Sequence, residues 1–340
     1  MTSHDHELRK HVVTFGELLM RLSPAGDERL LQSSVLHTCF GGAEANVAVG
    51  LAQFGVPVEY VTRVPDNPVA DAALRALHAE GVQTHGVIRG GSRLGLYFLE
   101  RGAGMRALRS VYDRADSAFA QLSPDEFDFD RVLRGASWLH LSGIVCALGE
   151  RPALAAARVV DTARALGVKV SLDLNYRPAL WTGRDPRPLL EPLASRVDLL
   201  IGNPGAFDIM LGERTRGAMP EPPDALAETA QRLRQRFGCE RVAITQREVL
   251  SANDHGWQAW LWHAHDARLH HGGRYAVRVI DRVGGGDAFV AGLLAMLRDD
   301  AEASHAVRFA TAAGAHKLTV PGDFPRTTRD EIMRMLEATL

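Results

Sequence analysis

The order of apolar and polar residues predicts strands and helices that alternate along most of the chain. Short apolar runs rich in β-branched residues indicate buried strands, whereas longer stretches with apolar residues three or four positions apart indicate helices. Strands are expected at 11–18, 58–64, 82–88, 138–141, 168–174, 197–201, 241–245 and 275–280, and helices at about 42–54, 69–80, 124–133, 152–166 and 224–237. This alternation predicts an α/β fold with a mostly parallel sheet and helices on both faces.

Two stretches, 17–38 and 92–115, interrupt this alternation. The second contains two short apolar runs on either side of the glycine-rich turn RGAGM, which predicts a hairpin. We expect the two stretches to form a small separate β-sheet, a lid that is inserted into a single domain of residues 11–335. Residues 1–10 are polar and are expected to form a disordered tail.

The composition favours a folded protein and gives no sign of a nucleic-acid or membrane partner. Of the 340 residues, 46% are hydrophobic and 24% are charged, which allows a substantial core, and the formal net charge is only −2. No apolar run reaches the ~18 residues of a membrane span, and the N-terminal MTSHDHELRKH lacks the apolar core of a signal peptide. Cys39, Cys146 and Cys239 have no metal-type spacing. We therefore expect a soluble, cytoplasmic protein.

A run of three glycines, Gly284, Gly285 and Gly286, lies between the predicted strand 275–280 and an apolar helix. Glycines at such a turn let several backbone N–H groups point at one spot, and the helix start adds unpaired donors and the positive end of its dipole. This arrangement predicts an anion site, most often for phosphate. The run is not a phosphate loop of the Walker type, because no Lys-Ser/Thr follows it, and it lacks the dinucleotide fingerprint.

Asp287 follows the glycines directly. We expect the helix dipole to keep this carboxylate ionised, so that it can accept a proton from a hydroxyl group at neutral pH. Beside a phosphate-binding turn, that hydroxyl would be a phosphoryl acceptor. The alternative is a purely structural role, since Asp is a favoured N-cap and Gly a favoured turn residue.

A second glycine site occurs in CFGGAEANVAVGLAQFG, where Gly41 and Gly42 open a helix and Asn46 lies one turn in. This stretch and the GGGD turn, about 240 residues apart, together resemble the two signature motifs of the ribokinase-like (PfkB) carbohydrate kinases, and the resemblance covers nearly the whole chain. It implies a three-layer αβα sandwich with a small β-sheet lid. It also implies that Asp287 is the catalytic base, that the three glycines form an anion hole, and that Gly41, Gly42 and Asn46 face the sugar.

Several pieces resemble the 2-keto-3-deoxygluconate kinases within that family, namely GGAEANVA, GLYFLE, SVYDRADSAFA, SLDLNYRPALW, TQREVLSANDHGW and DRVGGGD. The resemblance implies ATP-dependent phosphorylation of the primary C6 hydroxyl of this acid sugar, with Tyr97, Tyr112, Arg114 and Arg177 on the substrate. The residue types agree, because Arg offers paired N–H donors to a carboxylate. Arg177 follows the strand 168–174 at its carboxyl end, where ligands bind in open α/β sheets.

Other interpretations remain open. The two tyrosines could simply pack in the lid, and Arg114 could form an exposed pair with Asp113 or Asp116. The sugar could be fructose, ribose or another ketohexose derivative, and the chain could be a sugar- or nucleotide-binding protein without turnover. A dinucleotide-dependent dehydrogenase is disfavoured, because no fingerprint follows the first strand.

For the nucleotide, the resemblance implies ATP with Mg²⁺ at Asn175, Asn203, Thr245, Arg247, Ala312, Ala315 and His316, and a monovalent cation such as K⁺ at Asp281 and Val283. The chain departs from the family pattern where Ala206 replaces an acidic residue near the metal, with Asp208 two positions on, and where Arg282 replaces a threonine. The histidine-rich WHAHDARLHH lacks metal spacing and predicts a loop or hairpin. The open edges of the lid predict a homo-oligomer formed through it.

Overall fold

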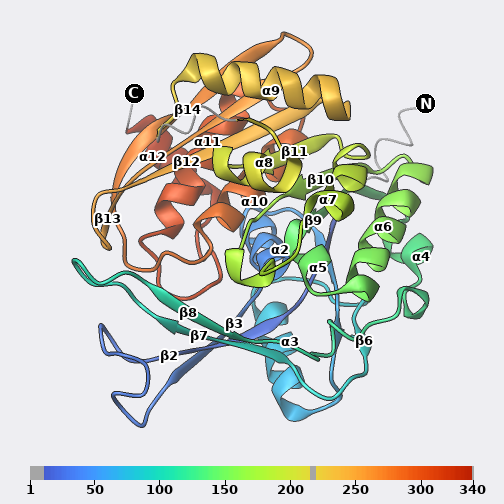
Figure 1. Cartoon of the computed structure of the whole chain (residues 1–340), viewed down its shortest axis with the longest axis vertical. Coiled ribbons are helices and arrows are strands. Elements are labelled where there is room, and N and C mark those ends of the chain that lie inside the picture. Colours follow the sequence, from blue (N-terminus) through green and yellow to red (C-terminus); the bar gives the residue numbers. More distant parts are fainter. Residues whose placement is uncertain (1–10, 215–219, 339–340) are drawn as a thin grey trace.

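The computed structural model describes residues 11–214 and 220–338, and these form a three-layer αβα sandwich with a separate small sheet (Figure 1). The main sheet has the strand order β14-β13-β12-β11-β10-β9-β1-β4. Its strands are β1 (His11–Phe15), β4 (Val58–Val61), β9 (Ala136–Ser142), β10 (Lys169–Asp173), β11 (Leu199–Gly202), β12 (Arg241–Val249), β13 (Asp254–His263) and β14 (Arg268–Arg278). The neighbours from β4 to β12 are parallel, and only β13 and β14 are antiparallel. The predicted mostly parallel sheet is confirmed.

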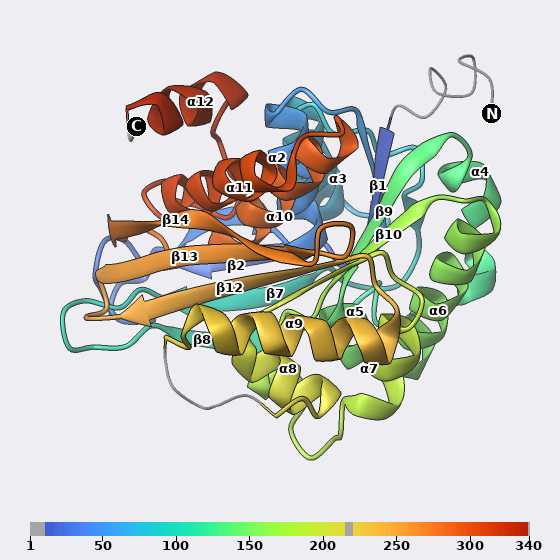
Figure 2. The same cartoon turned by 90° about the horizontal axis from the view of Figure 1, so that it is seen from above.

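Helices cover both faces of the main sheet (Figure 2). One face carries α2 (Ala43–Gln53), α3 (Pro68–Ala79), α10 (Gly285–Arg298), α11 (Ala303–Lys317) and α12 (Arg329–Glu337). The other carries α4 (Phe129–Leu133), α5 (Gly143–Ala147), α6 (Glu150–Ala165), α7 (Arg187–Ala194), α8 (Pro204–Leu211) and α9 (Pro223–Phe237). Each face has its own apolar core cluster, as expected for a parallel sheet that is buried on both sides.

The predicted lid is a four-stranded sheet with the order β3-β2-β7-β8, and it lies below the main body in Figure 1. Its strands are β2 (Leu19–Ser23), β3 (His37–Gly41), β7 (Gly95–Glu100) and β8 (Arg109–Asp113). The hairpin predicted around RGAGM is the antiparallel pair β7–β8. Among the described lid residues, Leu31, Val35 and Val111 expose apolar side chains, and oligomerisation through the lid stays a prediction.

Some predicted boundaries were wrong, and side-chain hydrogen bonds explain two of the differences. The strand expected at 82–88 is reduced to β6 (Ile88–Arg89), which pairs with β5 (Arg63–Val64). The N–H of Gly86 donates to the Glu59 carboxylate at 2.5 Å, so a side chain takes the place of a backbone carbonyl of a neighbouring strand. The helix expected at 124–133 is a 3₁₀ turn, η1 (Pro124–Glu126), followed by α4, because Asp128 caps a new helix start.

The first strand ends at Phe15 instead of residue 18, and the histidine-rich segment lies at the facing ends of the β13–β14 hairpin, as predicted. The tail predicted at residues 1–10 lies outside the described residues. Among the helices of the described chain, none is long and apolar enough to cross a membrane. Within the same residues, no three His, Cys, Asp or Glu side chains gather into a metal site.

Candidate active site

A cavity of about 690 Å³ lies between the lid and the carboxyl ends of the parallel strands. Strands β10, β11 and β12 are parallel, so their carboxyl ends meet at one edge of the sheet, and α2 and α10 begin at the same place. The residues predicted from the sequence that line this cavity are Gly42, Asn46, Tyr97, Tyr112, Arg114, Asn175, Arg177, Asn203, Thr245, Arg247, Val283, Gly284, Gly285, Gly286 and Asp287.

Asp287 is held in the first turn of α10 by a partner on α2. The Nδ2 of Asn46 donates to its Oδ2 at 2.7 Å, although the two residues are 241 positions apart. Burial raises the pKa of Asp287 to about 6, and the bond from Asn46 and the charge of Arg177 act in the opposite direction. Burial therefore outweighs the bond from Asn46 and the charge of Arg177, but the carboxylate is still mostly ionised at neutral pH. Asn46 Oδ1 is buried without a partner among the described residues.

The glycine turn needs its first glycine for steric reasons. Gly284 has φ of 83°, and a Cβ there would lie 2.5 Å from the carbonyl oxygen of Asp323. A Cβ on Gly285 would meet the flexible end of Leu318 at 2.8 Å, whereas one on Gly286 would meet nothing within 4 Å. Because the first N–H groups of α10 have no partner inside the helix, this turn offers donors to an anion in the cavity.

The glycine pair before α2 is required by packing as well. A Cβ on Gly42, whose φ is 150°, would lie 2.2 Å from the carbonyl oxygen of Glu17. A Cβ on Gly41 would lie 2.1 Å from Oδ2 of Asp323. Gly42 lines the cavity, but Gly41 does not; it makes room for the Asp323 carboxylate.

Three guanidinium groups, those of Arg177, Arg247 and Arg282, share one side of the cavity. Burial lowers the pKa of Arg247 to about 10, with Arg282 and Arg177 adding repulsion, and burial together with Arg177 lowers the pKa of Arg282. None of the three forms an ion pair with a described residue, and Nε of Arg247 is buried without a partner there. Because no carboxylate of the described chain forms an ion pair with these three groups, we expect the ligand to bring negative charge to this side of the cavity. The sequence indicated Arg282 only as a departure from the family motif.

The side chains of Arg114 and Tyr97 already form hydrogen bonds with carboxylates of the protein. Arg114 is buried, and its Nε donates to Oε2 of Glu17 at 2.7 Å, while Ser117 donates to Oε1 of the same carboxylate. Its partner is thus neither Asp113 nor Asp116, and Glu17 neutralises much of its charge. The hydroxyl of Tyr97 donates to Asp323. In the hairpin register Tyr97 lies opposite Tyr112, and their ring centroids are 6.0 Å apart.

The three predicted ATP residues on α11 lie outside the cavity. Ala312 and Ala315 are fully buried, and Nδ1 of His316 bonds to the hydroxyl of Thr327 at 2.9 Å. Trp257 of β13 packs against this part of α11 and donates its indole N–H to the Thr311 carbonyl at 3.0 Å. Ala312 and Ala315 therefore offer a nucleotide almost no surface in this structure, whereas contact with the half-buried His316 stays a prediction.

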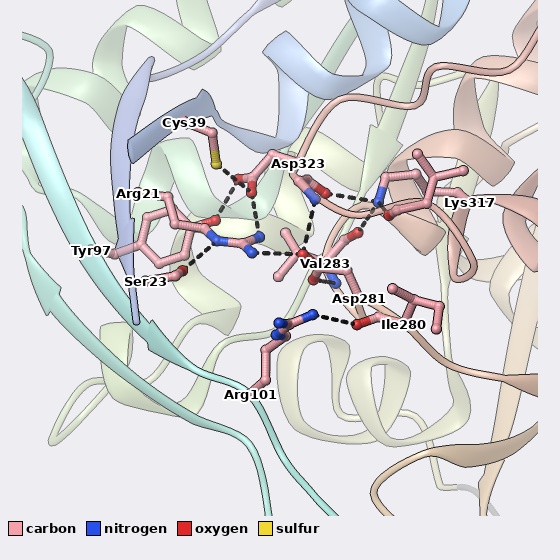
Figure 3. A network of polar contacts seen from close by, with 12 residues as sticks. Arg21, Ser23, Cys39, Tyr97, Arg101, Ile280, Asp281, Val283, Lys317 and Asp323 are labelled. Carbon is pink, nitrogen blue, oxygen red and sulfur yellow. Dashed lines mark hydrogen bonds and ion pairs between the residues drawn. The ribbon is translucent and has the colours of Figure 1, made fainter. Parts of the chain in front are cut away.

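Two acidic residues that the sequence placed near metal ions, Asp208 and Asp281, do not line the cavity. Asp208 is exposed on α8 and does not line the cavity, so no contact in this structure supports it as a replacement for the missing acidic side chain at Ala206, which is itself buried. Asp281 is buried, and its Oδ2 accepts from Nη2 of Arg21 at 2.6 Å. The carbonyl of Val283 accepts from the ammonium of Lys317 at 2.8 Å, so the predicted monovalent-cation position already holds a positive charge (Figure 3).

Two carboxylates in the cavity wall have no role predicted from the sequence, those of Glu44, which is buried, and Asp173, which is half-buried. Burial raises the pKa of each to about 7, and the nearby charge of Asp287 contributes in both cases. Oε1 of Glu44 accepts from the N–H of Ser142 at 2.8 Å, and Asp173 accepts from the backbone and side chain of Asn175, which has φ of 44°. Their position could have been found from an acidic residue in an apolar helix and from one at a strand's carboxyl end.

Replacement of Arg21 by Met is expected to lower the free energy of unfolding by about 3–5 kcal/mol, because the buried carboxylates of Asp281 and Asp323 then lose their ion-pair partner. Arg21 on β2 binds both at 2.6 and 2.7 Å, and all three side chains are nearly inaccessible. Denaturant titration measures the change. The matched control is Arg89→Met, which breaks the exposed pair with Asp71 and should cost less than about 1 kcal/mol. Equal effects of the two substitutions would contradict the account.

Comparison with known proteins agrees with this geometry. Residues 9–327 match the model of the pfkB family carbohydrate kinases. The chain is 31% identical over 325 residues to the 2-dehydro-3-deoxygalactonokinase of Haloferax volcanii, with 96% of each chain covered. It is 38% identical to the solved structure of 2-dehydro-3-deoxygluconokinase from Thermotoga maritima, with a TM-score of 0.93 over 97% of this chain and 100% of that one. A putative ribokinase II from E. coli, solved with ATP and Mg²⁺, shares the fold at 20% identity and a TM-score of 0.79, covering 97% of this chain and 99% of that one.

Proposed function

Because the chain belongs to the pfkB family of carbohydrate kinases, we propose that it transfers the γ-phosphoryl group of ATP to the primary C6 hydroxyl of 2-keto-3-deoxygluconate. The family match and the relatives show a phosphotransferase that acts on a sugar hydroxyl. The proposal adds the sugar, the hydroxyl and the nucleotide. One observation carries it: a single cavity contains a buried carboxylate, a glycine turn at a helix start, and three guanidinium groups without carboxylate partners among the described residues.

In this proposal Asp287 is the general base. It accepts the proton of the C6 hydroxyl while the hydroxyl oxygen bonds to the γ-phosphorus and ADP leaves. Asn46 fixes the orientation of the carboxylate through its 2.7 Å bond to Oδ2. The N–H groups of Gly285 and Gly286 stabilise the charge on the transferred phosphoryl group as it develops.

For the sugar, Arg177 is proposed to bind the carboxylate. It lines the cavity just beyond the carboxyl end of β10 and, unlike Arg114, has no carboxylate partner in the described chain. Asn46 Oδ1, buried and unpartnered, is suited to accept a bond from a sugar hydroxyl. An acid sugar is favoured because its carboxylate would pair with the guanidinium of Arg177, which makes no ion pair with a described residue. The sugars for which the two relatives are named, 2-dehydro-3-deoxygluconate and 2-dehydro-3-deoxygalactonate, both carry such a carboxylate, and the proposal covers both epimers.

For the nucleotide, Arg247, Arg282, Asn203 and Thr245 line the remaining wall and are proposed to face the phosphates. Mg²⁺, when bound, would neutralise charge on the phosphate oxygens. The residues fit such an ion, because the carboxylates of Asp173 and Asp287 lie close enough for Asp287 to raise the pKa of Asp173. Asp173 is proposed to hold water molecules of the hydrated ion, since Mg²⁺ commonly keeps several of them.

Product analysis tests this proposal. The chain is incubated with Mg-ATP and 2-keto-3-deoxygluconate, and the phosphorylated sugar is examined by ³¹P and ¹³C nuclear magnetic resonance. The expected product carries one phosphate, coupled to C6. A phosphate on a secondary hydroxyl, or ATP hydrolysis to inorganic phosphate without a sugar phosphate, would contradict the assignment of Asp287 to the C6 hydroxyl.

A further inference from the structure

We propose that the ammonium group of Lys317 is a built-in monovalent cation that holds the catalytic glycine turn in place, so that this kinase needs no K⁺ or other free monovalent ion. Lys317 is the last residue of α11, and its side chain is fully buried. It does not line the active-site cavity and therefore acts as a positioning residue. The inference rests on the proposed function only for its kinetic test.

The ammonium group is enclosed by backbone carbonyl oxygens. Nζ donates to the carbonyls of Val283 at 2.8 Å, Gly322 at 2.9 Å and Val320 at 3.0 Å. These oxygens come from two loops, one before the glycine turn and one after α11, and they match the three N–H groups of the ammonium. Three carbonyl dipoles that converge on one point form a cation site, and here a side chain fills it.

Two carboxylates lie around this ammonium. Burial lowers the pKa of Lys317, whereas the charges of Asp281 and Asp323 oppose this decrease. Both carboxylates are also bound by Arg21 of the lid strand β2, at 2.6 and 2.7 Å, and Asp323 accepts from Tyr97 of β7 (Figure 3). Two cations and two anions thus alternate in one buried cluster, and a further K⁺ ion would add an uncompensated positive charge.

The cluster is coupled directly to the catalytic turn. Val283, whose carbonyl binds Lys317, precedes Gly284, and a Cβ on Gly284 would lie only 3.0 Å from Cε of Lys317. The Lys317 side chain therefore packs beneath the peptide units whose N–H groups form the anion site. Since the carbonyl of Val283 is fixed by a covalently attached cation, the orientation of the following peptides does not depend on an ion from solution.

The first test uses the wild-type protein. ADP release is measured with the acid sugar and Mg-ATP in a buffer whose monovalent cation is tetramethylammonium, which is too large for the cage, and again with K⁺, Na⁺ or NH₄⁺ at equal ionic strength. The expected kcat is the same in all four. A kcat that depends on K⁺ or NH₄⁺ in the wild type would overturn the inference.

The second test empties the cage with Lys317→Ala, and Lys317→Met is the matched control that fills the space without charge. We expect the alanine variant in tetramethylammonium to lose about 10²-fold in kcat, on the scale of a lost oxyanion-hole donor, with little change in KM for the sugar. Added K⁺, NH₄⁺ or methylammonium should restore the rate in a saturable way, and the methionine variant should not respond. Full activity of the alanine variant without these ions, or no rescue by any of them, would overturn the inference.

A readout without substrate separates this inference from the proposed function. The melting temperature of the Lys317→Ala protein should rise with K⁺ or NH₄⁺ relative to tetramethylammonium, whereas the wild type and Lys317→Met should not respond differently to these ions. This result would support the cage even if no tested sugar were phosphorylated. If the alanine variant does not fold, the wild-type protein alone tests the inference: its melting temperature and kcat should be the same in all four cations.

Discussion

Replacement of Asp287 by Asn is expected to reduce kcat by about 10²–10⁴-fold, the range for loss of a general base. The amide has nearly the same shape, so the bond to Asn46, 2.7 Å in the wild type, and the start of α10 can be retained. Only the ability to accept the proton of the sugar hydroxyl is lost. Steady-state ADP release measures kcat, and calorimetric titration with the sugar measures binding, which should change little.

The matched control is Asp208→Asn, since Asp208 is exposed on α8 outside the cavity. This substitution should leave kcat unchanged and would also exclude Asp208 as a substitute for the missing acidic residue at Ala206. An Asp287→Asn protein with near-normal kcat would contradict the assignment of the base.

The raised pKa of Asp287 also predicts a pH profile for the wild type. Its value of about 6, above the ordinary 3.8, means that the base is protonated and inactive at a higher pH than an exposed Asp would be. kcat/KM should therefore be constant above this pKa and fall as the pH drops through about 6. A rate that stays constant down to pH values near 4 would show that no such carboxylate controls the reaction.

Replacement of Arg177 by Met is expected to lower kcat/KM for 2-keto-3-deoxygluconate by about 10²–10³-fold, because two charge-assisted hydrogen bonds to the carboxylate are lost. The same substitution should have a much smaller effect on any residual rate with fructose, which has no carboxylate. Initial rates with both sugars give this comparison.

Arg177→Lys keeps the charge but loses the paired geometry, and its loss should be intermediate. Arg151→Met, at an exposed position on α6, is the control for general effects of removing an arginine. If Arg177→Met reduced the rates with both sugars equally, Arg177 would act on the phosphates or the turn and not on the sugar carboxylate.

The features that could be predicted from the sequence are those encoded by neighbouring residues. The alternation of strands and helices, the lid hairpin and the GGGD turn each depend on a short stretch, and the structure contains all of them. The strand expected at 82–88 failed because Glu59, far away in the sequence, takes the hydrogen bond of Gly86. Local pattern contains no information about such a partner.

The site follows the same division. Asp287 and its glycines could be predicted because the carboxylate and the anion-binding turn are neighbours in the sequence. Asn46 and Arg177 could be predicted because the stretches that contain them resemble family motifs. The partners that neutralise Arg21 and Arg114 were not predicted, since Asp323 lies 302 positions from the first and Glu17 lies 97 from the second. In the sequence, Lys317 is a basic residue near the end of a helix, and such residues are ordinarily exposed. It is buried here because the fold brings three backbone carbonyls around its ammonium group.

The sugar specificity and the role of Asp287 can be measured together, as the rate of ADP release with Mg-ATP and each of 2-keto-3-deoxygluconate, its galacto epimer, fructose and ribose. We expect turnover with the two acid sugars, little with the neutral ones, and a rate about 10²–10⁴-fold lower in the Asp287→Asn protein. Efficient turnover of fructose or ribose without turnover of either acid sugar would contradict the carboxylate site at Arg177. No turnover of any sugar by the wild type would contradict the proposed reaction itself.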